Sequence, residues 1–307
     1  METKRIIVIG GSAAGPKAAS RARRMDENAE ISIYQKASDL SMASCGYPYY
    51  VGGFFDDRDQ LLCSPAGVVR DSKFFWNAKK ITTHVLTEVN NIDRKKKVIN
   101  FTNLTTGEKG SASYDKLVIA TGATARRPTV PGIDLKGITT LQSLSDADYL
   151  RKIKDEGVIK KAVVIGGGLI GIETVEALHL AGIDITLVEL LPQLLTFLDK
   201  QMARLVERYV QSKVNVILRN GLAAFLGEDG VLKAVKLQDG TEIPCDLAVL
   251  AVGVTPNTKL AKDAGLEIGE RGCIKVNSFM QTSDPDIYAV GDCIEIPNLI
   301  TNKWVHA

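Results

Sequence analysis

Two glycine-rich loops in this 307-residue chain have the residue types and spacing that bind the phosphates of a dinucleotide. The first loop, Gly10–Gly15, has the sequence GGSAAG, and the second, Gly166–Gly171, has the sequence GGGLIG. Glycines let a pyrophosphate approach the backbone, and the N–H groups at the start of the following helix give it a positive electrostatic environment. Two such loops in one chain predict two bound nucleotides, with electrons passing between them.

The second loop is the more regular of the two, because glycine fills all three of its glycine positions. Its expected nucleotide-binding residues are Gly166, Gly168, Leu169, Ile170 and Gly171. Glu189 ends the next expected strand, 18 residues after Gly171, where an acid binds the ribose hydroxyls. No arginine lies nearby to bind a 2′-phosphate, so the sequence favours NADH over NADPH.

The first loop departs from this pattern at two places. Ser12 takes the middle glycine position, and Gln35 stands where an acid would be expected, 20 residues after Gly15. A neutral amide can bind ribose hydroxyls, but it forfeits a charge-assisted hydrogen bond. Alone, the loop leaves open both a nucleotide site and a glycine turn without a ligand. The residues of such a site would be Gly10, Ser12, Ala13, Ala14, Gly15 and Gln35.

The segments around each loop have the pattern of a βαβ unit, which builds a parallel sheet. We expect strands 5–9 and 31–34 around a helix at about 16–24, and strands 162–165 and 184–188 around a helix at about 172–180. Further strands are expected at 116–120, 214–218, 231–237, 247–251 and 287–290. The pattern predicts an α/β protein in which one Rossmann-like nucleotide domain is inserted into another.

Cysteine provides the other candidate chemistry, and Cys45 is the strongest candidate among the five cysteines. It lies in a loop of small and polar residues before Tyr47, Tyr49 and Tyr50, where a thiolate could act as a nucleophile. An isolated buried cysteine is most often an inert small hydrophobe, which we expect of the others. These are Cys63, Cys245, Cys273 and Cys293. No CxxC pair is present, which argues against a disulfide framework and a metal site and suits a reducing cytoplasm.

Composition and charge narrow the class of protein. A hydrophobic content of 45%, a charged content of 24% and a net charge of +2 indicate a globular protein without a nucleic-acid-binding charge pattern. The basic cluster 94–97 is interpreted as a solvated hairpin turn. No apolar stretch is long enough to span a membrane, and the first strand begins too early for a signal peptide. We therefore expect a cytoplasmic protein.

The order of the motifs resembles that of the FAD-dependent pyridine nucleotide–disulfide oxidoreductases. The matching motifs are the two glycine loops, ATG at 120–122, GVTPN at 253–257 and QTSDPDIYAVGD at 281–292. The resemblance implies an FAD domain at 1–118 and 255–307 and an NADH domain at 119–254. It implies further FAD contacts from Lys36, Ser44, Thr121, Gly122, Gly291 and Asp292. Gly253 and Glu173 would contact NADH, with Glu173 near the nicotinamide.

The segment around Cys45 indicates the subgroup. Tyr50 stands where a second cysteine would complete a CxxxxC pair, so the chain resembles the single-cysteine members. These include coenzyme A-disulfide reductases, NADH oxidases, NADH peroxidases and persulfide or polysulfide reductases. The sequence CGYPYYVGG resembles the coenzyme A-disulfide and persulfide branch, whereas Ala13 replaces a histidine of the peroxidases. Met42 departs from the usual phenylalanine of the thiol-substrate pocket.

The resemblance implies a hydride path from NADH through FAD to a disulfide, persulfide or polysulfide, with Cys45 as the redox residue. Coenzyme A is one candidate substrate, bound through Arg21, Arg24 and Ser41, although the arginines equally fit a solvated helix face. Alternatives are an NADH oxidase, an electron-transfer reductase for a small redox protein, and a nucleotide-binding protein without turnover. Full-length members are homodimers through a C-terminal domain, which we expect this chain to lack.

Overall fold

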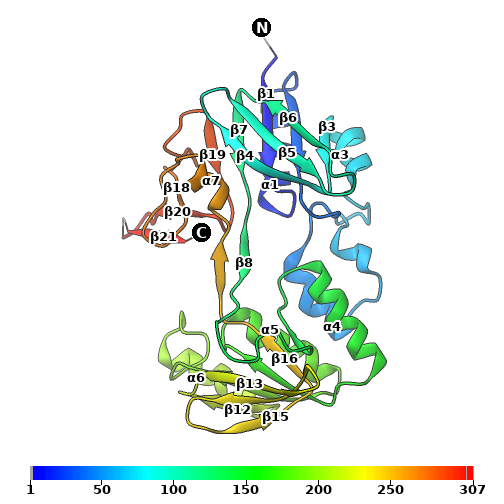
Figure 1. The fold of residues 1–307 in the computed structure, drawn as a ribbon, viewed down its shortest axis with the longest axis vertical. Helices are drawn as coiled ribbons and strands as arrows, with labels where there is room; N and C mark the ends of the chain where they lie inside the picture. The colour runs from blue at the N-terminus through cyan, green and yellow to red at the C-terminus, as the bar shows by residue number, and fades with distance from the viewer. Residues whose placement is uncertain (1–2, 302, 307) are drawn as a thin grey trace. The chain divides into compact units, whose positions relative to one another are not determined.

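The computed structural model describes residues 3–301 and 303–306 and divides the chain into two compact units (Figure 1). Unit 1 comprises Met1–Ala43, Asp59–Thr124 and Pro256–Ala307, and unit 2 comprises Ser44–Arg58 and Ala125–Thr255. Compared with the boundaries expected from the sequence, residues 44–58 and 255 group with unit 2 and residues 119–124 with unit 1. Which nucleotide each unit binds stays a prediction.

Unit 1 is built on a parallel sheet of five strands in the order β19-β7-β1-β2-β3 (Figure 1). These strands are β1 (Arg5–Ile9), β2 (Glu30–Tyr34), β3 (Ile81–His84), β7 (Lys116–Ile119) and β19 (Ile287–Ala289). Buried side chains of β1, β2 and β3 pack against helices α1 (Ala14–Met25) and α3 (Ser72–Lys79). The sheet thus brings the first glycine loop, which follows β1, to the carboxyl ends of its strands.

Smaller elements complete unit 1. An antiparallel sheet consists of β4 (Thr87–Asp93), β5 (Val98–Asn103) and β6 (Lys109–Ser113), and a third sheet of β18 (Ile274–Lys275), β20 (Ile294–Pro297) and β21 (Trp304–His306). The helical elements are η2 (Arg58–Leu61), which begins at the last residue of a unit 2 segment, and α7 (Lys259–Asp263). Buried side chains of β1, β7, β19, β5 and β20 share one core, so the sheets stabilise one another.

Unit 2 repeats the parallel arrangement with five strands in the order β12-β11-β10-β16-β9. They are β9 (Ile138–Thr139), β10 (Lys161–Ile165), β11 (Asp184–Glu189), β12 (Asn215–Leu218) and β16 (Leu247–Leu250). The longer helices are α4 (Leu144–Glu156), α5 (Leu169–Leu180) and α6 (Lys200–Gln211). An antiparallel sheet adds β13 (Leu222–Glu228), β14 (Val231–Leu237) and β15 (Glu242–Pro244).

The remaining elements lie where the chain passes between the units. The segment that unit 2 takes from the N-terminal part contains η1 (Ser44–Gly46) and α2 (Tyr47–Gly52). Strands β8 (Ala123–Ala125) and β17 (Val254–Pro256) pair with each other, and both later crossings of the chain fall within this pair.

The predicted strands are confirmed to within one residue at each end, and both predicted helices are present. Both helices begin earlier than expected, at Ala14 and Leu169 instead of about 16 and 172. The reason is that each glycine loop enters its helix directly, before the apolar periodicity by which a helix is detected in sequence begins.

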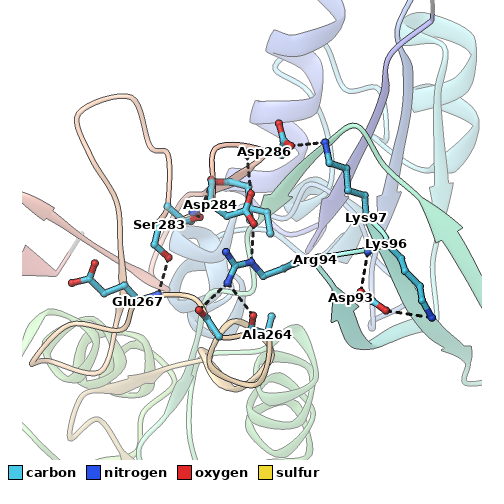
Figure 2. Close-up of polar contacts among 12 residues, drawn as sticks. Asp93, Arg94, Lys96, Lys97, Ala264, Glu267, Ser283, Asp284 and Asp286 are labelled. Carbon is cyan, nitrogen blue, oxygen red and sulfur yellow. Dashed lines mark hydrogen bonds and ion pairs between the residues drawn. The ribbon is translucent and has the colours of Figure 1, made fainter.

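The basic cluster Arg94–Lys97 forms the turn between β4 and β5, and Lys95, Lys96 and Lys97 are exposed as expected of a solvated turn, whereas Arg94 is half-buried. Figure 2 shows the Arg94 guanidinium between two other segments of unit 1. Its Nε donates to Asp284 Oδ2 at 2.7 Å and its Nη1 to the carbonyl of Gly265 at 2.9 Å. Lys97 pairs with Asp286 at 2.5 Å. The turn therefore fastens the antiparallel sheet to the loop that precedes β19.

A second charged contact of unit 1, between Arg5 and Asp115, predicts how the stability of this unit responds to acid. Arg5 donates from Nη2 to Asp115 Oδ1 at 2.9 Å and from its backbone N–H to Asp115 Oδ2 at 2.7 Å. These hydrogen bonds favour the ionised carboxyl and lower the pKa of Asp115 from 3.8 to about 2.

Because the folded-state pKa lies below the ordinary value, Asp115 stabilises unit 1 fully above pH 3.8, and this contribution is lost as the pH falls towards about 2. We expect Asp115→Asn to flatten the fall in melting temperature over this interval, measured by circular dichroism. Glu108→Gln, at an exposed acid of the same unit, serves as the control. An unchanged slope in Asp115→Asn would show that this contact does not contribute.

Candidate functional site

The two glycine loops have the same backbone construction. The N–H of Gly10 donates to the carbonyl of Tyr34, and the N–H of Gly166 donates to the carbonyl of Val188, both at 2.8 Å. Both first glycines have a φ near +110°, which disfavours other residues. The last glycine of each loop crosses so close to the first that an added Cβ would overlap its carbonyl oxygen. Each loop therefore needs glycine at both ends.

The side chain at the end of the second strand braces each loop. Gln35 Oε1 accepts a hydrogen bond from the N–H of Gly11 at 2.9 Å, and Glu189 Oε2 accepts one from the N–H of Gly167 at 2.6 Å. Gln35 is buried and Glu189 is half-buried. Both predicted strand-end residues thus lie beside their loops, although the amide is neutral and the carboxylate is charged.

The duplication extends beyond the motifs that were visible in the sequence. The N–H of Ser41 donates to the carbonyl of Gly11 at 2.8 Å, and the N–H of Leu195 donates to the carbonyl of Gly167 at 2.9 Å. Ser41 and Leu195 both have a positive φ, of 55° and 47°. Ser41 was expected to bind substrate, whereas its backbone supports the first loop. The serine and the leucine share no side-chain chemistry, so sequence comparison of the two halves does not reveal this match.

The helices after the loops have open N-termini. Neither α1 nor α5 has a side-chain cap or an acidic residue in its first turn. In contrast, Asp71, Ser143 and Asp199 cap α3, α4 and α6. Uncapped N–H groups and the positive end of the helix dipole are what a phosphate binds. Among the helices of eight or more residues in the described part of the chain, the two that follow glycine loops are therefore the ones prepared for an anion.

The other strand beside the one that precedes each loop, β7 next to β1 and β16 next to β10, also ends beside that loop. An added Cβ on Gly10 would overlap the carbonyl oxygen of Ala120, and one on Gly166 would overlap that of Ala251. This brings the predicted residues Thr121 and Gly122 to the first loop and Gly253 towards the second.

Asn257 holds the turn at Thr121 and Gly122 but was not among the predicted site residues. Its Nδ2 donates to the carbonyl of Thr121 at 3.0 Å, and its N–H donates to the carbonyl of Gly122 at 2.9 Å. The GVTPN motif, which ends with this asparagine, was the signal that could have identified it.

The turn at Gly291 and Asp292 lies at the start of α1. Gly291 has a φ of 78°, and a Cβ on it would stand 2.9 Å from the Cβ of Ala14. The side chain of Asp292 is exposed there. Residues 277 positions apart in sequence therefore meet at one helix N-terminus, as the motif order implied.

A cavity of about 640 Å³ in unit 1 follows from this arrangement. It is of the size that holds a small ligand or part of a cofactor. Its lining includes Gly10, Gln35, Lys36, Thr121, Thr124 and Asn257. Lys36 also forms an ion pair with Glu88 at 2.8 Å on the wall of the cavity. The open helix, the glycine cradle and this cavity together fit the adenosine and phosphate end of a dinucleotide.

Cys45 lies in η1 of unit 2 and is the one exposed cysteine; all five cysteines are free thiols. Burial raises the pKa of the thiols of Cys245, to about 12, and of Cys273 and Cys293. Burial therefore disfavours the thiolate at these three positions. Exposure leaves Cys45 as the cysteine best placed to meet a substrate, and Ser44 beside it is exposed as well.

Other residues predicted to bind a cofactor or substrate are exposed, on α5 of unit 2 and on the first loop and α1 of unit 1. In unit 2, Leu169, Ile170 and Glu173 lie exposed on the first turns of α5. Partial desolvation, followed by the charge of Glu176, raises the pKa of the Glu173 carboxyl. In unit 1, Ser12 and Ala13 are exposed in the loop, and Arg21 and Arg24 are exposed on α1.

Arg23, between these two arginines, has a structural role. Its Nε donates to the carbonyl of Lys79 at 3.0 Å and its Nη2 to that of Lys80 at 2.8 Å. These carbonyls end α3, so Arg23 caps that helix. Only Arg21 and Arg24 of the three arginines are left as candidates for an anionic substrate.

Two features of other protein classes, a membrane-spanning helix and a metal-ligand cluster, are missing from the described residues. No helix in the described part of the chain combines the length and apolar character needed to cross a bilayer. Among residues 3–301 and 303–306, no three histidine, cysteine or acidic side chains gather as a metal site would require.

Comparison with known proteins places this geometry in context. The family model described as pyridine nucleotide-disulphide oxidoreductase matches residues 4–307. The chain is 35% identical over 301 residues to an NADH oxidase of Methanocaldococcus jannaschii, covering 97% of this chain and 65% of that protein. It is 34% identical over 305 residues to an NAD(P)H coenzyme A polysulfide/persulfide reductase of Pyrococcus horikoshii, covering 98% and 66%.

A solved structure agrees with these relatives. The NAD-dependent persulfide reductase from A. fulgidus superposes with a TM-score of 0.95 at 40% identity, over 99% of this chain and 56% of that one. The chain thus spans slightly less than two thirds of the two curated relatives and just over half of the solved one.

The glycines of the second loop yield a test that separates folding from binding. A Cβ on Gly171 would overlap Gly166, whereas one on Gly168 would meet no atom within 4 Å. We expect Gly171→Ala to lower the melting temperature and to abolish NADH binding.

Gly168→Ala should keep the wild-type melting temperature yet weaken NADH binding, because the added methyl occupies the space where the pyrophosphate approaches the backbone. Calorimetric titration with NADH and thermal unfolding measure the two effects. Wild-type affinity in Gly168→Ala would argue against a pyrophosphate at this loop.

Proposed function

Because the chain belongs to the pyridine nucleotide-disulphide oxidoreductase family, we propose that it passes electrons from NADH through FAD to a disulfide, persulfide or polysulfide. One observation carries this proposal: two open glycine cradles occur in a chain whose only exposed cysteine precedes a tyrosine-rich helix. A donor nucleotide, a carrier nucleotide and a sulfur nucleophile are the parts that such a reaction needs.

FAD is proposed for unit 1. Gly10, Gly15 and the open end of α1 would hold its pyrophosphate, and Gln35 its ribose. Asp292 and Thr121, at the same end of the sheet, would contact the remaining part of the cofactor. The cavity of about 640 Å³ supports the adenosine half of this assignment.

NADH is proposed for unit 2. The open end of α5 would bind its pyrophosphate, and the Glu189 carboxylate would accept hydrogen bonds from the ribose hydroxyls. A 2′-phosphate would place a second negative group beside this carboxylate, which disfavours NADPH.

Cys45 is proposed as the nucleophile. Its thiolate attacks one sulfur of the substrate, forms a mixed disulfide with that part and releases the other part as a thiolate. Return of Cys45 to the thiolate consumes two electrons and releases the bound sulfur as a thiol, and supplying those electrons from NADH is the chemistry that FAD provides when bound. The names of the P. horikoshii and A. fulgidus relatives support a small sulfur substrate, coenzyme A derivatives among them.

Reduction of oxygen is the second candidate reaction, favoured by the name of the M. jannaschii relative. In that reaction Cys45 would cycle through a sulfenic acid. Oxygen consumption compared with turnover of coenzyme A disulfide separates the two. An electron-transfer reductase for a small redox protein would need no cysteine at position 45.

The setting of the protein is part of the same proposal. We place it in the cytoplasm, because five unpaired cysteines suit a reducing compartment. A homodimer is proposed on the family resemblance, and size-exclusion chromatography with light scattering tests it.

Substitution of Cys45 tests its proposed role as the nucleophile. We expect Cys45→Ser to lose disulfide and persulfide reduction, by about a thousandfold or more, because an alcohol is a far weaker nucleophile than a thiolate. Reduction of the bound flavin by NADH, followed anaerobically by the visible absorbance of the flavin, should continue in the variant. Cys63→Ser is the matched control, since Cys63 is half-buried and its Sγ contacts the carbonyl of Gly67. Full reductase activity in Cys45→Ser would overturn the proposal.

Substitution of Glu189 tests the assignment of NADH to unit 2. Its replacement by alanine removes charge-assisted hydrogen bonds, so the KM for NADH should rise about tenfold to a hundredfold. The preference for NADH over NADPH should fall at the same time. Gln35→Ala is the comparison, because it should weaken FAD retention and leave the KM for NADH nearly unchanged. If Glu189→Ala retains the wild-type preference for NADH, the assignment of unit 2 fails.

A further inference from the structure

We propose that Arg151, on helix α4, is the positioning residue that fixes the segment carrying Cys45. The proposal rests on the proposed role of Cys45 as the redox residue. It concerns unit 2 alone, because both α4 and residues 44–58 belong to that unit.

The Arg151 guanidinium binds the backbone of this segment at two places. Its Nη1 donates to the carbonyl of Tyr50 at 2.8 Å and to the carbonyl of Phe55 at 2.9 Å. Its Nη2 donates to Asp56 Oδ1 at 2.5 Å, and its carbon centre lies 5.3 Å from the centre of the Tyr50 ring. One side chain thus joins the end of α2 to the loop that follows it.

The guanidinium is itself held in place. Asp155, one turn further along α4, accepts a hydrogen bond from Arg151 Nε at 2.8 Å. The Arg151 side chain is only 12% exposed, whereas the Asp56 and Asp155 side chains are 88% and 51% exposed. The buried contacts of Arg151 are therefore those with backbone carbonyls and with the Tyr50 ring. These contacts fix the position of the segment, whereas solvent screens the attraction of an ordinary surface ion pair.

Helix α2 has the buried face that such an anchor needs. Tyr47, Tyr50 and Val51 are each less than a tenth exposed. Gly52 lies so near α5 that an added Cβ would stand 3.4 Å from the Cα of Ala177. Gly53 ends the helix with a φ of 85° and donates its N–H to the carbonyl of Tyr50, the same carbonyl that Arg151 binds.

This anchor controls Cys45 through a short connection. Cys45 is the middle residue of η1, and α2 begins directly after η1 ends. On the other side, the N–H of Ala43 donates to the carbonyl of Leu61 at 2.8 Å within unit 1. Displacement of α2 would therefore move the cysteine, and a misplacement of about 1 Å in a reacting group can cost about a hundredfold in rate.

The test compares Arg151→Met with Arg151→Lys and with Lys152→Met. Methionine keeps much of the length and apolar volume but removes every donor, and lysine restores a charge with one donor centre. Lys152 lies on the same helix, has a 72% exposed side chain and makes only a loose contact of 3.8 Å with Glu156, so it is the matched control.

Three measurements are made on each holoenzyme: kcat and KM for coenzyme A disulfide, the anaerobic rate of flavin reduction by NADH, and the pH profile of Cys45 alkylation by iodoacetamide. The alkylated peptide is identified by mass spectrometry. We expect Arg151→Met to lower kcat for the disulfide by about tenfold or more, to change the alkylation profile and to leave flavin reduction nearly unchanged. Arg151→Lys should be intermediate, and Lys152→Met should match the wild type.

Wild-type kcat and an unchanged alkylation profile in Arg151→Met would overturn the proposal, as would an equal loss in flavin reduction, which indicates general destabilisation. If Arg151→Met does not fold, Arg151→Lys decides by the same criteria. If the wild-type protein does not reduce the disulfide, the proposed function fails, and the alkylation profiles still test whether Arg151 positions Cys45.

Discussion

Close approach of backbone to backbone within each glycine loop is the constraint on which the rest of the structure depends. The last glycine of a loop crosses the first without room for a side chain, both at Gly10 with Gly15 and at Gly166 with Gly171. This crossing aims the following helix so that its uncapped N-terminus faces the carboxyl ends of the strands. The neighbouring strand, β7 or β16, and the strand-end side chain then enclose the same point, so one steric condition produces a binding site twice in one chain.

The two glycine-loop sites differ in the charge of the strand-end side chain that braces the loop. In unit 2 the second oxygen of Glu189 accepts a hydrogen bond from the N–H of Leu191 at 2.8 Å. In unit 1 the Nε2 of Gln35 donates to the carbonyl of Asp39 at 3.2 Å. The loop after each strand therefore offers the partner that its own side chain requires, a donor for the carboxylate and an acceptor for the amide. Gln35, which stands where an acid was expected, is thus supported by its surroundings.

The sequence predicted the parts of the fold that are encoded locally. Strands 5–9 and 162–165 were predicted from apolar runs, and the glycine spacing marks the loops that follow them. Gln35 and Glu189 were located by their distance from these loops. The sequence did not predict the ion pairs of Arg94 or the packing of α2 on α4 and α5, because both depend on residues far apart in the chain. The bounds of β4 were not predicted either, because buried and exposed residues alternate little along this strand.

The excursion of residues 44–58 into unit 2 has a consequence for modularity. A recombinant or evolutionary exchange of residues 125–255 as one cassette would leave this segment in the recipient chain. The buried faces of Tyr47, Tyr50 and Val51 would then meet a helix pair that had not been selected with them. Compatible exchange requires the short segment and the long one to be transferred together, although 66 residues lie between them. The two units are thus distinct as compact bodies but not as continuous stretches of gene.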